Sequence, residues 1–317
     1  MTEPKLRFLT AWFCPFAHRA HIALEHLRLR YEWVEALGWF QENGEWHHYK
    51  TDELRSSNPM GTVPTFIETA SKAGAQLGTR SVYESLVCIE YCNDLAALAA
   101  SNGGAMGRRA FSDIGTANDG NSVTRKAPSL SSPSSPHVPL LLLSTDPFER
   151  AKQRAEAQVV NKTLCSPYYS VLVRTDEEER REHFERLLRD LRAFSRRMGE
   201  RQMQTSRDAS GSGDNYYCWG DGKLSIVDCA LLPHAYRYFV LEHFRGRDFA
   251  IPKNDPDLEP FHRWLLAMTD ASKEPAIAPT LPNKTRYLEH VRKYAENTAR
   301  SKVAEAVRAG TPAHEMK

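Results

Sequence analysis

Neither sign of charge dominates this sequence of 317 residues, which has 42 basic and 40 acidic side chains and a formal net charge of +2. Bulk electrostatics therefore gives no reason to expect a nucleic acid or a membrane as a partner. Long hydrophobic runs are also missing. The densest, residues 138–143, is far shorter than the ~20 residues that a membrane-spanning helix needs. Residues 1–7 contain Glu3 and no apolar signal region, so we expect a cytoplasmic protein.

Cysteine is scarce as well. The six cysteines lack the spacing of a zinc site or a disulfide framework, which fits a reducing compartment. Cys88 and Cys92 lie four residues apart on an expected helix, where packing explains them better than redox pairing. Cys14, His18 and His21 do not have a standard zinc spacing and lack an obvious fourth ligand, so we expect no metal.

The first 95 residues alternate short strand signals with helical ones. This order predicts an α/β fold, in which helices cover a small sheet. We expect strands at 5–10, 31–37, 64–68 and 80–83, helices at 15–29 and 84–94, a crossover rich in Trp and His at 46–57, and a long hairpin loop at 69–79.

The rest of the chain has two different compositions. Residues 96–139 are rich in Ser, Gly, Asn and Pro and poor in apolar side chains, which predicts a flexible linker insertion. From residue 140 to 317 the patterns are all helical. Asp146 before Pro147 is typical of a helix start. Further helices are expected at 176–200, from Ser225 to about Glu242, at 256–270 and at 283–309, with a polar loop at 201–215.

Ser225 and Asp228 are three residues apart just before an apolar run. This spacing predicts a capping box, which is a folding signal and not a chemical site. Tyr216, Tyr217 and Trp219 are expected to pack the preceding polar loop against the helices.

Cys14 is the most informative residue for chemistry. It follows a strand and precedes Pro15, which suits the first position of a helix. The thiol would then lie where unpaired backbone N–H groups and the positive end of the helix dipole converge, which favours the thiolate. The alternative is a small hydrophobic residue at a helix start. Because residue 17 is Ala, no resolving cysteine follows, and the site would be a monothiol site.

Three further features suit a small peptide ligand. A cis Pro64 at the start of a strand would turn the backbone N–H and C=O of Val63 outward, where they can pair with a peptide. At the next strand-to-helix junction, Glu84 suits an ammonium group, and Ser85 with the helix start suits a carboxylate. Lys50 adds a positive charge ahead of the proline turn. Together they predict a site for a zwitterionic peptide that carries a thiol.

The chain resembles cytosolic glutathione transferases of the omega type, which use a cysteine. The matching segments are Cys14-Pro15-Phe16-Ala17 with Arg19, Asn58-Pro59-x-Gly61-x-Val63-Pro64, Tyr83-Glu84-Ser85 and Ser225-x-x-Asp228. The resemblance implies an N-terminal thioredoxin-like domain at 1–95 and an all-helical C-terminal glutathione-transferase domain at 140–317. The linker insertion at 96–139 has no counterpart in the family.

By this resemblance, Cys14 forms a mixed disulfide with glutathione, and Phe16 packs beside it. The other implied glutathione contacts are Lys50 near the glycyl carboxylate, Val63 and the cis Pro64 at the cysteinyl backbone, and Glu84 and Ser85 at the γ-glutamyl end. The implied activity is that of a glutathione-dependent thioltransferase acting on glutathionyl mixed disulfides, dehydroascorbate or glutathionyl adducts. Glutathione is the implied co-substrate, and a homodimer is among the implied assemblies. The alternative is a non-catalytic regulatory or scaffold protein with the same fold.

Two groups of histidines stay ambiguous in the sequence. His18 is expected on the solvent-facing side of the first helix, with a role beside the cysteine as the alternative. His47 and His48, next to Trp46, suit either the mouth of the site or an exposed crossover.

Overall fold

The computed structural model describes residues 5–72, 75–101, 141–208 and 215–315. The chain divides into two compact units. The first contains residues 1–38 and 50–143, and the second contains residues 39–49 and 144–317. Most of the expected insertion at 96–139 lies outside the described residues, but its first part, 96–101, is helical.

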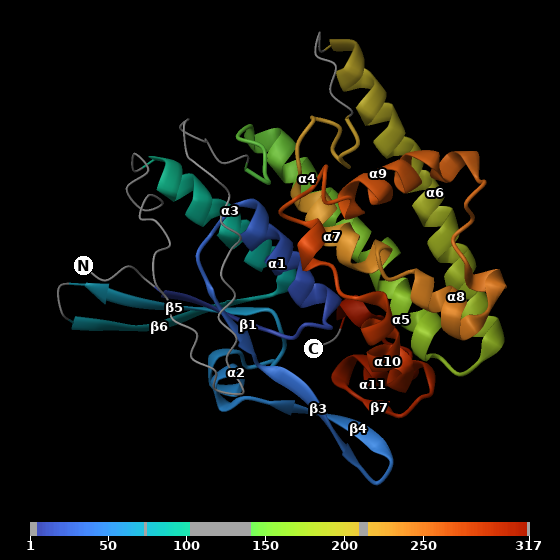
Figure 1. Cartoon of the computed structure of the whole chain (residues 1–317), viewed down its shortest axis with the longest axis horizontal. Helices are drawn as coiled ribbons and strands as arrows, with labels where there is room; N and C mark the ends of the chain where they lie inside the picture. Colours follow the sequence, from blue (N-terminus) through green and yellow to red (C-terminus); the bar gives the residue numbers. More distant parts are fainter. Residues whose placement is uncertain (1–4, 73–74, 102–140, 209–214, 316–317) are drawn as a thin grey trace. The chain divides into compact units, whose positions relative to one another are not determined.

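The first unit is built around a four-stranded sheet with strand order β2-β1-β5-β6. β1 is parallel to β2 and antiparallel to β5, which is antiparallel to β6. Helices α1 and α3 lie side by side over one face of this sheet (Figure 1). The elements are β1 (Lys5–Thr10), α1 (Pro15–His26), β2 (Glu32–Glu35), α2 (Asp52–Ser57), β5 (Thr65–Lys72), β6 (Ala75–Tyr83) and α3 (Ser85–Ser101).

Phe8 lies at the centre of this unit and is 0% exposed. Its ring packs edge-on against Trp33 at 5.5 Å and tilted against Phe66 at 5.3 Å, centroid to centroid. Burial of one such side chain stabilises a fold by about 2–3 kcal/mol. The alternation of side chains along β1 places Phe8 on this buried face.

Helix α1 ends three residues earlier than its apolar pattern predicts. Arg28 adopts a left-handed backbone, with φ 53°. The N–H of Leu29 donates to the carbonyl of Leu24, and that of Arg28 to the carbonyl of Glu25. This is the Schellman arrangement, which closes a helix by satisfying its last carbonyl groups.

Two sequence predictions for the first 95 residues are wrong. The expected loop at 69–79 is mostly strand, because Thr69 pairs with Thr79 and Lys72 with Ala75. The expected crossover at 46–57 begins as a strand: β3 (Leu37–Glu42) and β4 (Glu45–Lys50) form a hairpin. Asn43 and Gly44 at its turn both have positive φ, as in a type I′ turn.

The second unit is mainly helical. Its helices are α4 (Pro147–Val160), α5 (Ser166–Val173), α6 (Glu177–Asp208), α7 (Ile226–Ala235), α8 (Phe239–Arg245), α9 (Glu259–Thr269), α10 (Lys284–Ala295) and α11 (Lys302–Arg308). Asp146 caps α4 as predicted, since its carboxylate accepts the N–H of Glu149 at 2.8 Å. A π-helical turn, Asn161–Cys165, joins α4 to α5 just before Pro167, whose ring excludes a regular helical turn there.

Three helix predictions in this unit need correction. The single helix expected from Ser225 to about Glu242 is divided by a turn at residues 236–238 into α7 and α8. α6 continues to Asp208, through the first part of the loop expected at 201–215. The single helix expected at 283–309 is interrupted by the strand β7 (Ala299–Arg300), and Asn297 before it has a left-handed φ of 62°. β7 joins the hairpin in a sheet of order β3-β4-β7.

The predicted capping box is present, and its Asp228 carboxylate accepts more hydrogen bonds than the motif implies. Asp228 is 0% exposed. One carboxylate oxygen accepts the N–H and the hydroxyl of Ser225, at 2.9 and 2.6 Å. The other accepts the N–H of Cys218 at 2.9 Å and the indole N–H of Trp264 at 2.8 Å. One carboxylate thus connects α7, α9 and the segment before α7.

Tyr216 and Tyr217 anchor the segment before α7 to Glu274, whereas residues 209–214 of the loop that they were expected to pack lie outside the described residues. Both hydroxyls donate to one oxygen of Glu274, at 2.8 and 2.6 Å. Glu274 is 6% exposed, and burial raises its pKa above the ordinary 4.5, although the two hydroxyls act in the opposite direction.

This raised pKa predicts how stability depends on pH. The folded protein holds the Glu274 proton more tightly than the unfolded chain, so the free energy of unfolding falls as pH rises above 4.5. Glu274→Gln keeps an acceptor for the tyrosines and removes the titration. We expect this variant to be at least as stable as the natural chain at neutral pH and to match it below 4.5. Urea unfolding across this pH range checks the expectation, and a variant with the same pH slope as the natural chain would contradict it.

Candidate active site

Cys14 occupies the N-cap position of α1, and Pro15 is the first helical residue, as the sequence predicts. Its N–H donates to the carbonyl of Ala11 at 2.9 Å, and its own carbonyl accepts the N–H of His18 at 3.0 Å. The side chain is partly exposed and its Sγ lies 3.9 Å from the carbonyl oxygen of Val63. The thiol therefore lies at a helix start, next to the proline turn.

The proline turn is held by Asn58, which is fully buried. Its amide N–H₂ donates to the carbonyl of Thr62 at 2.9 Å and to the Thr65 hydroxyl at 3.0 Å. Its side-chain oxygen accepts the N–H of Met60 at 2.9 Å. The peptide bond between Val63 and Pro64 is cis, as expected. These side-chain bonds fix the turn that brings the Val63 carbonyl to the thiol.

Arg19 connects two of the expected contact residues. It is 0% exposed, and its guanidinium donates to the Ser85 hydroxyl at 3.0 Å and lies 5.0 Å from the ring centroid of Phe16. A hydroxyl that accepts from arginine can still donate its own hydrogen, which suits a carboxylate ligand. Ser85 is also the first residue of α3, where backbone N–H groups have no helical partner. A carboxylate at this position would meet several donors.

Glu84 precedes α3 in a left-handed conformation, with φ 75°. Its side chain is exposed, and its carbonyl accepts the N–H of Cys88 at 2.8 Å. A left-handed backbone conformation destabilises a residue that has a Cβ by roughly 1–2 kcal/mol, and such strain is typical of functional positions. Glu84 is thus an exposed acidic residue directly before Ser85 at the start of α3.

Glu84→Gly should therefore separate stability from binding. Glycine adopts a positive φ without strain, so we expect the free energy of unfolding to rise by about 1 kcal/mol. Loss of the carboxylate should weaken binding of a ligand ammonium group. Glu84→Gln is the matched control, because it loses the charge and keeps the strain. Urea unfolding and calorimetric binding measure the two effects, and a glycine variant less stable than the glutamine variant would refute the strain account.

Lys50 is the last residue of β4, and its side chain passes over Gly61 in the proline turn. A Cβ added to Gly61 would lie 2.9 Å from the Lys50 Nζ, and Gly61 has φ 56°. The positive φ is what favours glycine at 61, and the lysine side chain lies over the space that a Cβ would take. This contact places the Lys50 amine beside the same turn as Val63.

All of the predicted site residues lie in the first unit, and two contacts link them in pairs: Cys14 with Val63, and Phe16 with Ser85 through Arg19. Sequence reasoning noted Arg19 as part of a motif but missed its bridging role. The sequence feature that could have indicated this role is the arginine within the apolar helical segment 17–24.

The expectation for His18 is wrong. Its side chain is buried, 5% exposed, and its ring centroid lies 6.2 Å from that of His21. His21 in turn packs against Trp33. Both histidines belong to the inner face of α1. The described residues contain no group of three His, Cys, Asp or Glu side chains that could hold a metal ion.

The other five cysteines are all buried. Burial raises the pKa of Cys88, Cys218 and Cys229 above the ordinary 9.0, which keeps these thiols protonated and unreactive. Cys14 is the partly exposed cysteine of the chain. The packing role expected for Cys88 and Cys92 agrees with their burial.

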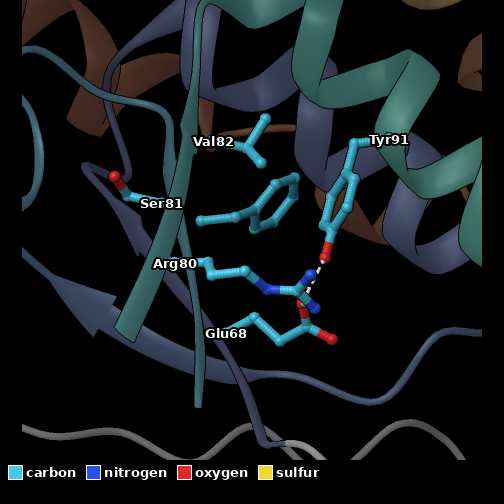
Figure 2. A pocket seen from close by; sticks show the side chains of 6 residues that line it. Glu68, Arg80, Ser81, Val82 and Tyr91 are labelled. Atoms are coloured by element: carbon cyan, nitrogen blue, oxygen red, sulfur yellow. Dashed lines mark hydrogen bonds and ion pairs between the residues drawn. The ribbon is translucent and has the colours of Figure 1, made fainter. Parts of the chain in front are cut away.

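A separate pocket of about 220 Å³ lies between β5, β6 and α3 (Figure 2). Its polar groups already satisfy one another, because the Glu68 carboxylate accepts from Arg80 at 2.5 Å and from the Tyr91 hydroxyl at 2.9 Å. Burial and the neighbouring carboxylate raise the pKa of Tyr91 to about 12. None of the predicted contact residues lines this pocket, which is lined by Phe66, Glu68, Arg80, Ser81, Val82 and Tyr91.

Within the described ranges, no helix is long and apolar enough to cross a membrane. Residues 13–95 match the family model of the glutathione S-transferase N-terminal domain. No curated protein matches the chain.

Several solved structures share the fold. Glutathione transferase Omega 3C from Trametes versicolor is 20% identical, with a TM-score of 0.54 over 92% of this chain and 91% of that one. The Tau class glutathione S-transferase of mango, Mangifera indica, is 18% identical, with a TM-score of 0.58 over 92% and 98%. Ure2p in complex with glutathione is 15% identical, with a TM-score of 0.55 over 88% and 94%. The expected fold, a thioredoxin-like domain followed by a helical one, is confirmed.

Proposed function

We propose that this chain, which carries a glutathione S-transferase N-terminal domain at residues 13–95 and has the fold of solved glutathione transferases, is a glutathione-dependent monothiol thioltransferase. The observation that carries the proposal is the position of Cys14. Its sulfur lies at the start of α1 and 3.9 Å from the Val63 carbonyl, beside the turn that would bind the peptide backbone of glutathione.

The reaction has two exchange steps. The Cys14 thiolate attacks the glutathionyl sulfur of a mixed disulfide, and the substrate thiolate leaves. The new bond joins Cys14 to glutathione. A second glutathione thiolate then attacks this bond, which releases glutathione disulfide and restores the Cys14 thiolate. The sum of the two steps consumes one free glutathione: the substrate leaves as a thiol, and its glutathionyl group leaves in glutathione disulfide.

The other residues orient glutathione for this exchange. We assign the γ-glutamyl ammonium to Glu84 and its carboxylate to Ser85 and the start of α3. Lys50 would attract the glycyl carboxylate, and Val63 and Pro64 would hold the cysteinyl backbone. Phe16, whose ring lies 5.0 Å from the Arg19 guanidinium, would pack beside the thiol. The reducing conditions of the cytoplasm would keep Cys14 and glutathione as thiols.

A panel of substrates tests this function. We expect glutathione-dependent reduction of a small glutathionyl mixed disulfide and of dehydroascorbate, and slower conjugation of an aryl halide. The reason is that a cysteine forms a bond with glutathione, whereas conjugation needs a free glutathione thiolate. Conjugation without disulfide reduction would contradict the proposal. Glutathione binding by calorimetry without turnover of any substrate would favour the non-catalytic alternative.

A further inference from the structure

Arg19 is a charged side chain in the interior of the first unit. It is 0% exposed, and the other buried residues of α1 are apolar side chains and two histidines. Burial of a guanidinium costs free energy that burial of an apolar side chain does not. The charge also persists throughout the physiological pH range, since arginine does not lose its proton in proteins. Packing of α1 alone therefore does not explain an arginine at this position.

The guanidinium of Arg19 lies at the start of α3. It donates to the Ser85 hydroxyl at 3.0 Å, and Ser85 is the first residue of that helix. The first turn of a helix presents backbone N–H groups without a helical partner and the positive end of the helix dipole. The arginine charge adds to this positive potential, so the surroundings of Ser85 favour an anion over a neutral or cationic group.

The same contact determines which way the Ser85 hydroxyl donates. A serine oxygen has two lone pairs and one hydrogen, and Arg19 occupies one lone pair. The hydrogen therefore points away from the guanidinium, and a hydroxyl that accepts from a charged donor becomes a stronger donor itself. A carboxylate oxygen at ordinary hydrogen-bond distance from this hydroxyl would lie within roughly 6 Å of the guanidinium nitrogen, where the two charges still attract each other appreciably.

Arg19 also connects this position to the thiol, because both residues belong to α1. Cys14 is the N-cap of the helix, and Arg19 follows roughly 7–8 Å along the helix axis. Between them, the Phe16 ring lies 5.0 Å from the guanidinium. α1 and α3 lie side by side (Figure 1). The helix that carries the nucleophile thus also carries the charge behind Ser85, which fixes the two positions relative to one rigid element.

We propose that Arg19 is a positioning residue of the glutathione site, which acts through the Ser85 hydroxyl to hold the γ-glutamyl carboxylate at the start of α3. The inference rests on the proposed function, since it assigns Arg19 to the binding of glutathione. Arg19 acts on the ligand through Ser85 and not by direct contact. The alternative role is a structural tie between α1 and α3, whose loss would affect every ligand of the site equally.

Two ligands separate these roles in the full chain. One is reduced glutathione, and the other is 4-aminobutyryl-cysteinylglycine, which lacks the γ-glutamyl carboxylate and keeps every other group. Arg19→Gln keeps a donor for Ser85 and loses the charge. We expect this variant to bind glutathione about tenfold more weakly, as for one charge interaction over this distance, and to bind the analogue as the natural chain does. Isothermal titration calorimetry measures both affinities.

Two further variants complete the experiment. Arg19→Lys keeps the charge and should retain most of the affinity for glutathione, because the bond to Ser85 uses a single guanidinium nitrogen. Arg7→Met is the matched control. It removes an arginine of the same unit whose ion pairs are with Glu32 and Glu53, away from the predicted contact residues, and should change the affinity for neither ligand.

The outcomes separate this inference from the proposed function. A natural chain that does not bind glutathione overturns the proposed function, and this inference with it. Equal losses for the two ligands in Arg19→Gln, or a natural chain that binds both ligands equally, overturn the positioning role alone. A lysine variant as weak as the glutamine variant does the same, because the charge would then not be the cause. If Arg19→Gln does not fold, Arg19→Met, which leaves no polar group in its place, replaces it with the same expected result.

Discussion

Cys14→Ser is expected to reduce turnover of a glutathionyl mixed disulfide to the rate of the uncatalysed exchange. The serine hydroxyl is almost never ionised near neutral pH, and an oxygen cannot form the disulfide that carries the glutathionyl group between the two steps. The measurement couples glutathione disulfide formation to its enzymatic reduction and follows the absorbance of the nicotinamide cofactor. Glutathione binding itself should persist, because Glu84 and Ser85 are unchanged.

Cys88→Ala is the matched control for this loss. Cys88 is fully buried, and burial raises the pKa of its thiol, so it contributes packing and no chemistry. We expect the control to retain its turnover per folded molecule. Substantial turnover in Cys14→Ser would place the nucleophile elsewhere and remove the basis of the monothiol mechanism.

Asp228→Ala is expected to cause the largest loss of stability, about 4 kcal/mol. The carboxylate accepts four hydrogen bonds, from the N–H and hydroxyl of Ser225, the N–H of Cys218 and the indole of Trp264. Alanine leaves these donors buried without an acceptor, and each unsatisfied donor costs about 1–3 kcal/mol. Urea unfolding followed by far-ultraviolet circular dichroism measures the loss in the helical unit.

Ser225→Ala is the comparison variant at the same capping box. It removes the hydroxyl of the cap and leaves the other three donors of Asp228 in place, so a loss of about 1 kcal/mol is expected. If Asp228→Ala cost no more than Ser225→Ala, the carboxylate would be an ordinary helix cap, and its wider role between α7 and α9 would be refuted.

The parts of the fold that follow local rules were predictable from the sequence. Cys14 and Pro15 at the start of α1, Asp146 before α4 and the pair of Ser225 and Asp228 all depend on spacing within one turn of helix. Such signals involve neighbours in the chain, so no knowledge of the tertiary structure is needed.

The hairpin of β3 and β4 was missed for two reasons. Its turn, Asn43-Gly44, is a strong local signal, but it lies between strands whose Trp and His side chains do not alternate as clearly as aliphatic ones. Its partners are at the other end of the chain: Arg300 is 255 residues from Glu45. Pairing over such a separation leaves no local pattern.

The candidate site also contains features that local motifs predict and features that depend on the tertiary structure. The short motifs located Cys14, Val63 and Ser85, because each lies at a strand or helix end that sequence marks. They did not indicate that His18 is buried or that Arg19 bridges Phe16 to Ser85. The burial of His18 and the bridge formed by Arg19 depend on which face of α1 packs against the rest of the unit. The sequence does not mark that face, because α1 is apolar or aromatic around much of its circumference.

The most direct test of the account is to find where glutathione becomes attached. The natural chain is incubated with a small glutathionyl mixed disulfide, and intact-mass and peptide mass spectrometry locate the modification before and after addition of reduced glutathione. The account predicts one glutathionyl group per chain, on Cys14, which reduced glutathione removes. An unmodified Cys14, or a glutathionyl group that reduced glutathione leaves in place, would contradict the proposed monothiol cycle.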